Sequence, residues 1–227
     1  MKIHRFYTPD IHLEQECWIN QAELLHQWNK VLRFRAGQQV VLFDGVKHDR
    51  LYEITDIGPK EARLVHITDY KRSVPKQDIY LFWSLLKKDK NDWVLQKGTE
   101  LGVRHFIPIV ADRSEKTGFN HERAEKIIIE AAEQCGRSDI PNVREPLPVN
   151  KAIEQYKGKV ALYICEQDGE DLAIQDGPRG VFIGPEGGWS DAEKQYFDHI
   201  AIGHLNIHDF TLRAETAAVT SVVRLLQ

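Results

Sequence analysis

The sequence lacks the features of a secreted or membrane-bound protein. Its 3 cysteines, Cys17, Cys135 and Cys165, are an odd number, lie far apart and include no Cys-x-x-Cys pair. Reduced thiols are therefore expected instead of disulfides or a zinc site. No stretch approaches the roughly 18 apolar residues of a membrane span, and the start carries no basic-then-apolar signal region. We therefore expect a cytoplasmic protein with no membrane segment.

Common enzyme motifs are also missing. The sequence contains no Gly-x-x-x-x-Gly-Lys-Ser/Thr, Gly-x-Gly-x-x-Gly, Gly-x-Ser-x-Gly or His-Glu-x-x-His. The 10 histidines are scattered, and His204 and His208 fall in a strand-to-loop stretch where a spacing of four has no metal-binding meaning. These absences argue against the usual nucleotide-binding enzymes, serine hydrolases and zinc proteases, and we expect no metal site.

The chain has no excess of basic residues, although a nucleic-acid partner would favour one. Its formal net charge is −4, and the acidic excess falls in the second part. Residues 1–72 carry 11 basic and 10 acidic side chains, whereas residues 73–227 carry 19 and 24. Local basic clusters remain, and clusters of this kind are more often solvated surface than phosphate contacts. They are Arg33 with Arg35, Lys71 with Arg72, and Lys87 with Lys88 and Lys90.

What is present indicates two folded parts. The 227 residues, 42% hydrophobic and 28% charged, suit one large or two modest globular domains. In the first part, short apolar or β-branched runs at residues 38–43, 51–56 and 62–68 have the spacing of a small β-barrel, and residues 22–32 show helical periodicity. The polar, proline-containing stretch 71–77 marks a domain boundary.

Beyond this boundary, strand and helix patterns alternate. The apolar runs are too continuous for a half-exposed sheet, so they predict an α/β fold with a parallel sheet that is covered on both faces. The predicted strands are residues 79–85, 106–110, 160–165 and 181–183, and the predicted helices are residues 89–101 and 121–135.

The most informative segment is Gly184-Pro185-Glu186-Gly187-Gly188, which directly follows a short apolar run. Ser190 and Glu193 then provide the capping box of a new helix. Glycines let a ligand contact the main chain, and loops at the carboxyl ends of parallel strands are where α/β sheets bind small molecules. A lone motif of this kind is more often a tight turn, so its weight depends on the segments around it.

Three further segments accompany this motif. Residues 211–219 open a terminal helix with Arg213 and Glu215 in its first turn, beside the backbone donors of the helix N-terminus. Residues 96–103 read QKGTELGV, and residues 130–137 read EAAEQCGR. In this order and at these separations, the four segments resemble the bacterial family of 16S ribosomal RNA (uracil-N3)-methyltransferases of the SPOUT superfamily. The resemblance covers nearly the whole chain and is weaker in the N-terminal part.

The resemblance implies a fold, a substrate and a cofactor. Residues 1–72 would form a PUA-like β-barrel that grips RNA, and residues 73–227 a SPOUT domain with a C-terminal trefoil knot. The protein would methylate N3 of a uridine in the 16S rRNA of the small ribosomal subunit, with S-adenosylmethionine as methyl donor. The shared active sites of the superfamily imply a homodimer.

The resemblance also assigns residues to the site. The loop after Cys165 and two further loops would bind the cofactor. Arg137 and Arg213 would stabilise negative charge on the uracil or hold phosphate, and Glu215 would orient one of them. A salt bridge at a helix start is the alternative for Arg213, and a surface ion pair with Glu100 is the more frequent role for Lys97. The predicted cofactor residues are Ile183, Gly184, Glu186, Gly187, Gly188, Ile207 and Leu212, and the predicted RNA-binding residues are Arg33, Arg35, Lys71, Arg72, Lys87, Lys88 and Lys97.

One segment departs from the family pattern. Members usually read Leu-Gly-x-Arg-Ile-Leu-Arg where this chain has residues 207–213, so His208 replaces the glycine and Phe210 the first arginine. Two alternatives to the N3 methyltransferase follow. The chain could be a non-catalytic RNA-binding protein with a degenerate cofactor pocket, or a SPOUT methyltransferase for another RNA position or base.

Overall fold

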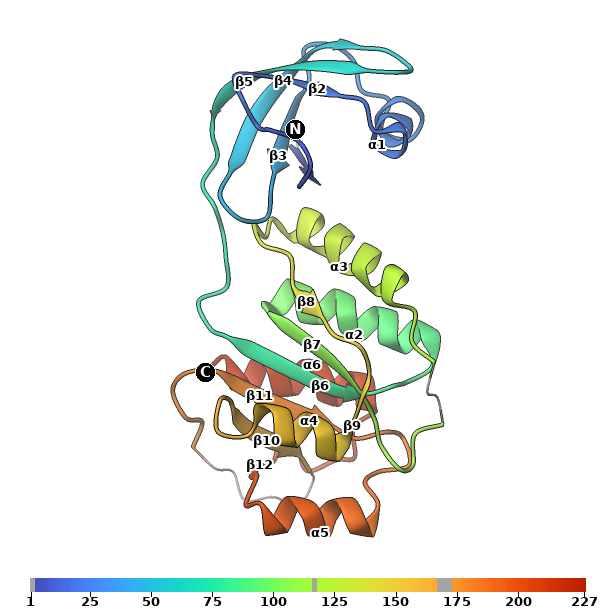
Figure 1. The fold of residues 1–227 in the computed structure, drawn as a ribbon, viewed down its shortest axis with the longest axis vertical. Helices are drawn as coiled ribbons and strands as arrows, with labels where there is room; N and C mark the ends of the chain where they lie inside the picture. Colours follow the sequence, from blue (N-terminus) through green and yellow to red (C-terminus); the bar gives the residue numbers. More distant parts are fainter. Residues whose placement is uncertain (1–2, 116–117, 167–172) are drawn as a thin grey trace. The chain divides into compact units, whose positions relative to one another are not determined.

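The computed structural model describes residues 3–115, 118–166 and 173–227, which fold into two compact units (Figure 1). The first unit comprises Met1–Val74 together with Ala132–Ile140. The second comprises Pro75–Ala131 and Pro141–Gln227. The segment Ala132–Ile140 thus packs with the N-terminal unit, although it lies far beyond it in the sequence.

The N-terminal unit is built on a five-stranded sheet in the order β1-β3-β4-β5-β2. The pair β1 and β3 is parallel, and the other neighbours are antiparallel. Strand β3 is apolar on both faces, because Val40, Val41, Leu42 and Phe43 are all fully buried. The strands are β1 (His4–Tyr7), β2 (Glu16–Ile19), β3 (Gln39–Phe43), β4 (Asp49–Ile57) and β5 (Ala62–Asp69).

The helical stretch of this unit covers the predicted residues but changes form midway. Helix α1 (Ala22–His26) continues into a wider π-helical turn, η1 (Gln27–Leu32), which ends at Arg33 in the left-handed conformation with φ 55°. Trp28 in η1 is fully buried, and its ring centre lies 5.1 Å from that of Phe6. The turn thus closes one side of the core of the unit.

A buried carboxylate joins the returning segment to this sheet. The Asp49 side chain is 0% exposed and accepts hydrogen bonds from Arg5 Nη2 at 2.5 Å and from Ser138 Oγ at 2.6 Å. Arg72 Nε lies 3.4 Å from the other carboxylate oxygen, and Arg72 also donates to the Ser138 carbonyl at 3.0 Å. Two arginines therefore compensate one buried negative charge, and Ser138 fastens its segment to β4 through it.

The second unit has a parallel sheet in the order β12-β10-β11-β6-β7-β8, with β9 also pairing with β7. All residues of β11 are buried, as expected for a strand covered on both faces. The predicted parallel α/β arrangement is confirmed. The strands are β6 (Ile79–Ser84), β7 (His105–Val110), β8 (Asn142–Val143), β9 (Leu147–Pro148), β10 (Ala161–Cys165), β11 (Arg179–Ile183) and β12 (Gly203–Leu205).

Helices cover both faces of this sheet (Figure 1). Helix α6 packs against α2 and over β6 and β11, while α4 and α5 contribute Ile153 and Phe197 to the core on Phe82 and Phe182. No helix among the described residues is long and apolar enough to cross a membrane. The trefoil knot that the family resemblance implies stays a prediction. The helices are α2 (Lys88–Leu101), α3 (His121–Cys135), α4 (Val149–Tyr156), α5 (Asp191–His199) and α6 (Ala214–Leu225).

Candidate functional site

A cavity of about 720 Å³ lies where the neighbouring strands β10, β11 and β12 end. Parallel strands bring their carboxyl ends to one edge of the sheet, and the loops that leave them form the walls. Cys165 at the end of β10 lines the cavity, and burial raises the pKa of its thiol above the ordinary value. Residues 167–172 of the loop that follows lie outside the described residues. The predicted cofactor residues on the wall are Ile183, Gly184, Glu186, Gly188, Ile207 and Leu212.

The glycines of the loop after β11 have different structural roles. Gly188 has φ +67°, a conformation that side-chain-bearing residues rarely adopt, and a Cβ there would meet nothing within 4 Å. A Cβ at Gly184 would lie 3.1 Å from the Trp189 ring, which closes the cavity beside it. Gly187 is not on the wall, and its carbonyl accepts from Arg113 Nη1 at 3.3 Å. Gly184 and Gly188 thus present bare backbone on this part of the wall.

The predicted capping box closes this loop. Ser190 Oγ accepts from the Glu193 backbone N–H at 3.1 Å, and Glu193 Oε2 accepts from the Ser190 backbone N–H at 2.8 Å. Both hydrogen bonds satisfy donors that would otherwise be orphaned at the start of α5. The helix start therefore fixes the far end of the glycine loop.

Lys90 on α2 joins two walls of the cavity. Its Nζ lies 3.1 Å from Glu186 Oε1 in the glycine loop and 3.3 Å from Glu215 Oε2 on α6. The hydrogen bond to Glu186, with that to Glu215, raises the pKa of Lys90 above its ordinary value. No local sequence pattern indicates this contact, because the three residues lie on separate elements.

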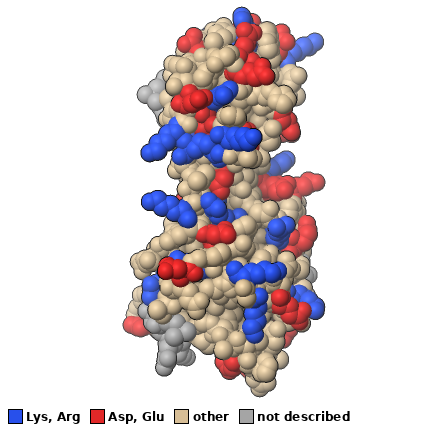
Figure 2. Space-filling view, turned by 60° about the vertical axis from the view of Figure 1, so that its left-hand side comes forward, with Lys and Arg blue, Asp and Glu red and all other residues tan. Residues whose placement is uncertain are grey.

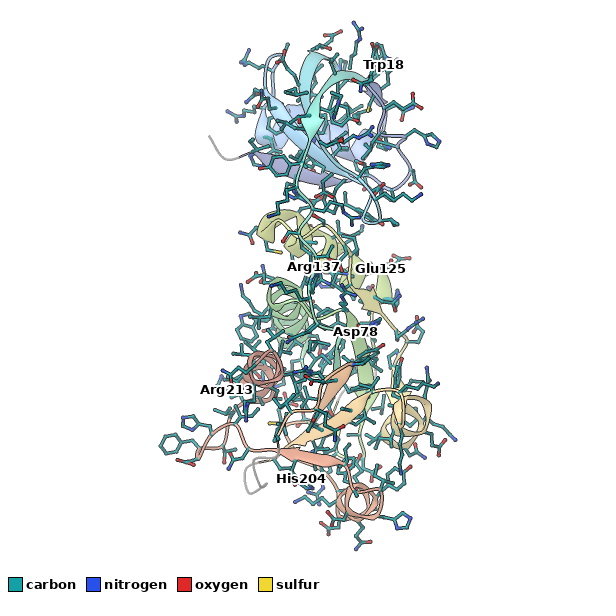
Figure 3. All side chains as sticks on the ribbon, turned by 90° about the vertical axis from the view of Figure 1, so that its left-hand side faces the viewer. Trp18, Asp78, Glu125, Arg137, His204 and Arg213 are labelled. Carbon is teal, nitrogen blue, oxygen red and sulfur yellow. The ribbon has the colours of Figure 1, made fainter. Side chains whose placement is uncertain are left out.

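The two predicted catalytic arginines lie in different settings. Arg213 is exposed on the cavity wall and is labelled in Figure 3. Among the described residues, no ion pair or side-chain hydrogen bond involves its guanidinium. Arg213 is the N-cap of α6 with φ −66° and ψ 148°, so it precedes the first turn in which it was predicted to lie, and the helix begins at Ala214. Glu215 contacts Lys90 in this structure, and its predicted role in orienting an arginine stays a prediction.

Arg137 is not among the residues that line the cavity. It belongs to the N-terminal unit, is 5% exposed, and donates from Nε to Asp139 Oδ1 at 2.8 Å and from Nη2 to Asp139 Oδ2 at 2.9 Å. The two donors and two acceptors match in a planar fork, which is the strong form of an arginine–carboxylate pair. The role of Arg137 in the reaction stays a prediction.

The predicted RNA-binding residues also divide. Arg33, Arg35, Lys71 and Lys87 are exposed, whereas Arg72 is held in the Asp49 network and Lys97 pairs with Glu100 at 2.8 Å. Lys88 begins α2, and its side chain lies outside the described part. Basic and acidic side chains intermingle on the face in Figure 2, with a row of basic side chains on the N-terminal unit.

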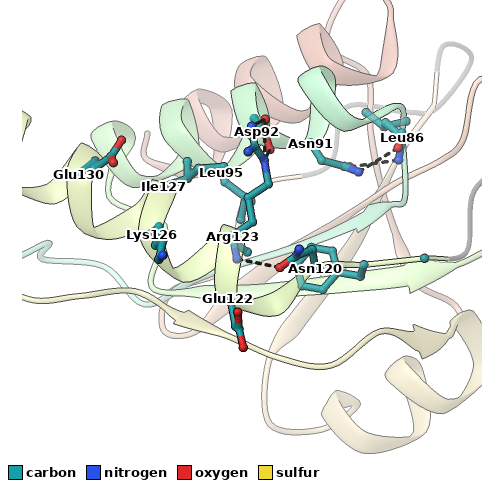
Figure 4. Close-up of a pocket in the computed structure, with 13 residues that line it drawn as sticks. Leu86, Asn91, Asp92, Leu95, Asn120, Glu122, Arg123, Lys126, Ile127 and Glu130 are labelled. Atoms are coloured by element: carbon teal, nitrogen blue, oxygen red, sulfur yellow. Dashed lines mark hydrogen bonds and ion pairs between the residues drawn. The ribbon is translucent and has the colours of Figure 1, made fainter. Parts of the chain in front are cut away.

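A second cavity, of about 890 Å³, lies along α2 and α3 (Figure 4). Its wall carries the ion pair of Arg123 Nη2 with Asp92 Oδ2, at 2.5 Å. Most of this wall consists of helix side chains, and it contains none of the strand-end glycine loops that characterise small-molecule sites in parallel sheets. The cavity at the ends of β10, β11 and β12 is therefore the better candidate.

Comparisons with known proteins agree with this geometry. Residues 73–226 match the model of an RNA methyltransferase domain, and residues 30–65 match that of an RNA methyltransferase PUA domain. The ribosomal RNA small subunit methyltransferase E of Bacillus subtilis is 30% identical over 76% of this chain and 75% of its own. Its counterpart in Rickettsia conorii is 27% identical over 100% of this chain and 97% of its own.

A solved structure shares the fold. The protein from Legionella pneumophila, solved with the bound cofactor SAM, superposes with a TM-score of 0.88 at 26% identity, covering 99% of this chain and 97% of its own. The parallel sheet, the glycine loop and the sequence relatives thus all indicate the same family. The chain belongs to the ribosomal RNA small subunit methyltransferase E family of RNA methyltransferases.

Proposed function

We propose that this protein transfers a methyl group from S-adenosylmethionine to N3 of a uridine in the 16S rRNA of the small ribosomal subunit. The observation that carries the proposal is the cavity at the ends of β10, β11 and β12, whose walls come from the glycine loop and the start of α6. These are the segments on which the family resemblance depends.

The cavity suits this cofactor. Its volume of about 720 Å³ falls in the range of small-molecule sites, about 300–1,000 Å³. Ile183, Ile207 and Leu212 provide apolar wall for an adenine ring, while Glu166 and Glu186 provide acceptors for positively charged groups. S-adenosylmethionine, when bound, supplies an activated methyl group on a sulfonium.

Arg213 has the position that the chemistry of the base requires. Uracil N3 carries a proton, and negative charge spreads onto the flanking carbonyl oxygens as that proton leaves. A guanidinium on the cavity wall, without a carboxylate partner in the described part of the chain, can stabilise this charge. The remaining catalysis is positioning, because in-line transfer needs N3 aligned with the methyl carbon.

RNA binding is assigned to exposed basic residues of the N-terminal unit, with Arg33, Arg35 and Lys71 as the principal candidates. These side chains can neutralise phosphates, which gives affinity without sequence preference. We further propose that the protein works as a homodimer in the cytoplasm, where its ribosomal substrate is found.

Two measurements test the proposal. Calorimetry with S-adenosylmethionine should give saturable binding, and nucleoside mass spectrometry on 16S rRNA from a deletion strain should show the loss of 3-methyluridine. An absence of cofactor binding would favour the non-catalytic RNA-binding protein. Loss of a different methylated nucleoside would favour a methyltransferase for another position or base.

Gly188→Val should weaken cofactor binding at least tenfold. A β-branched residue at φ +67° is strained by about 1–3 kcal/mol and will shift the loop that forms the wall. The matched control is Gly158→Val, because Gly158 has φ +80°, also has free space around its Cβ, and is not on this wall. Calorimetry should separate the two variants, and equal affinities would show that the glycine loop does not bind the cofactor.

Lys90→Met should lower cofactor affinity on the order of tenfold, since two partly exposed ion pairs each contribute up to about 1 kcal/mol. The change leaves Glu186 and Glu215 facing each other without their shared cation. Lys90→Arg should retain most of the affinity. Cofactor titrations at constant ionic strength check this, and parental affinity in the methionine variant would show that the bridge is only a surface contact.

A further inference from the structure

The loop between β12 and α6 carries two aromatic rings, those of His208 and Phe210, that have no role in the reaction described above. Phe210 is 73% exposed, and His208 and Phe210 both line the cofactor cavity. Figure 3 shows this loop projecting from the edge of the sheet next to the start of α6. These two residues stand where the family pattern described above has a glycine and an arginine.

The loop holds the two rings in a defined arrangement. The His208 backbone N–H donates to Asn206 Oδ1 at 3.1 Å, and the Phe210 backbone N–H donates to His208 Nδ1 at 3.1 Å. The ring centres are 5.0 Å apart with an angle of 30° between their planes. The side chains of Asn206 and His208 thus each accept from the backbone N–H two residues later, as in Asx-type turns. The loop therefore orients the phenyl face before any ligand arrives.

An exposed aromatic face at the mouth of such a cavity fits an unpaired nucleobase. Proteins that recognise single-stranded RNA stack splayed-out bases on aromatic side chains, and enzymes that modify a base take it out of its stack first. Arg213, three residues on, places positive charge beside the same mouth. A base leaving the RNA stack would therefore exchange one stacking partner for another at the entrance to the site.

We propose that Phe210, oriented by His208, is a stacking platform for a base of the RNA substrate at the entrance to the cofactor cavity. The proposal rests on the proposed methyltransferase function and adds a specificity-determining residue to it. The stacked base is the target uridine or its immediate neighbour, because both must pass or border the mouth of the cavity when N3 reaches the methyl group.

The test compares Phe210→Leu with Phe210→Tyr in the full-length protein. Leucine keeps an apolar side chain but removes the π-face, whereas tyrosine keeps the ring. Single-turnover methylation of unmodified small ribosomal subunits, at saturating S-adenosylmethionine, should show an RNA half-saturation concentration raised about tenfold for leucine and near the parental value for tyrosine. The maximal rate should change by a much smaller factor than the half-saturation concentration.

Two control measurements keep the result specific. The calorimetric affinity for S-adenosylmethionine and the sedimentation mass should be the same in both variants and the parent. Parental RNA half-saturation in Phe210→Leu would overturn the proposal. So would a loss of cofactor affinity, which makes the ring part of the cofactor pocket, or a drop in mass, which makes it a contact between copies. A parent that binds cofactor but methylates no RNA would instead overturn the proposed function.

Discussion

Arg213→Ala should slow methyl transfer by on the order of a hundredfold or more, the loss expected when one preorganised charge stabiliser is removed. Arg213 lines the cavity and lies at the positive end of the α6 dipole, where a cation does not stabilise a helix. The substitution should therefore leave the melting temperature unchanged or slightly higher. Single-turnover methylation of unmodified small ribosomal subunits, alongside thermal unfolding, measures both effects.

The control for Arg213 is Arg224→Ala at the other end of the same helix. Arg224 does not line the cavity, and its Nη1 donates to Gln227 Oε1 at 3.4 Å on the exposed side. This variant should methylate at the parental rate. If Arg213→Ala also kept that rate, or lost activity only because it unfolded, Arg213 would be a structural residue at a helix start.

Asp49→Ala should destabilise the N-terminal unit by about 3–5 kcal/mol. The carboxylate is completely buried between Arg5, Arg72 and Ser138, so its removal leaves two guanidinium groups without their shared counter-charge and Ser138 without an acceptor. Urea unfolding gives the change in free energy. Amide hydrogen exchange in β3 and β4 should show that the loss is located in this unit.

Asp69→Ala is the matched control for Asp49→Ala, because it removes an exposed carboxylate from the same sheet. Asp69 is 76% exposed and pairs with Arg50 at 3.1 Å on the same sheet. Screened by water, such a pair contributes under about 1 kcal/mol, so its loss should scarcely move the unfolding midpoint. Similar losses for both variants would mean that the buried network around Asp49 adds nothing beyond an ordinary surface ion pair.

Local signals in the sequence predict much of this fold because they act over a few residues. The α3 boundaries, His121–Cys135, are the predicted ones, and the capping box of Ser190 and Glu193 is present as both reciprocal hydrogen bonds. Continuous apolar runs predict the buried strands of the parallel sheet because both faces of such strands are covered. Residues 22–32 are helical as predicted, but packing of Trp28 accompanies a wider π-helical turn in their second half.

Contacts between distant segments could not be predicted in this way. Asp49 meets Ser138 only because a stretch of residues far along the chain returns to the N-terminal sheet. Lys90 meets Glu186 and Glu215 only after three elements have packed together. The sequence around a basic residue does not indicate its partner, so the contact of Arg72 with the buried Asp49 carboxylate could not be predicted.

The thiol on the cavity wall has a chemical consequence for an enzyme that holds an alkylating agent. Only the thiolate form of cysteine is a strong nucleophile, and burial keeps Cys165 in the neutral form by raising its pKa. At neutral pH the wall therefore presents a poor competitor for the activated methyl group. The packing at the end of β10 thus disfavours the thiolate that alkylation of this wall would require.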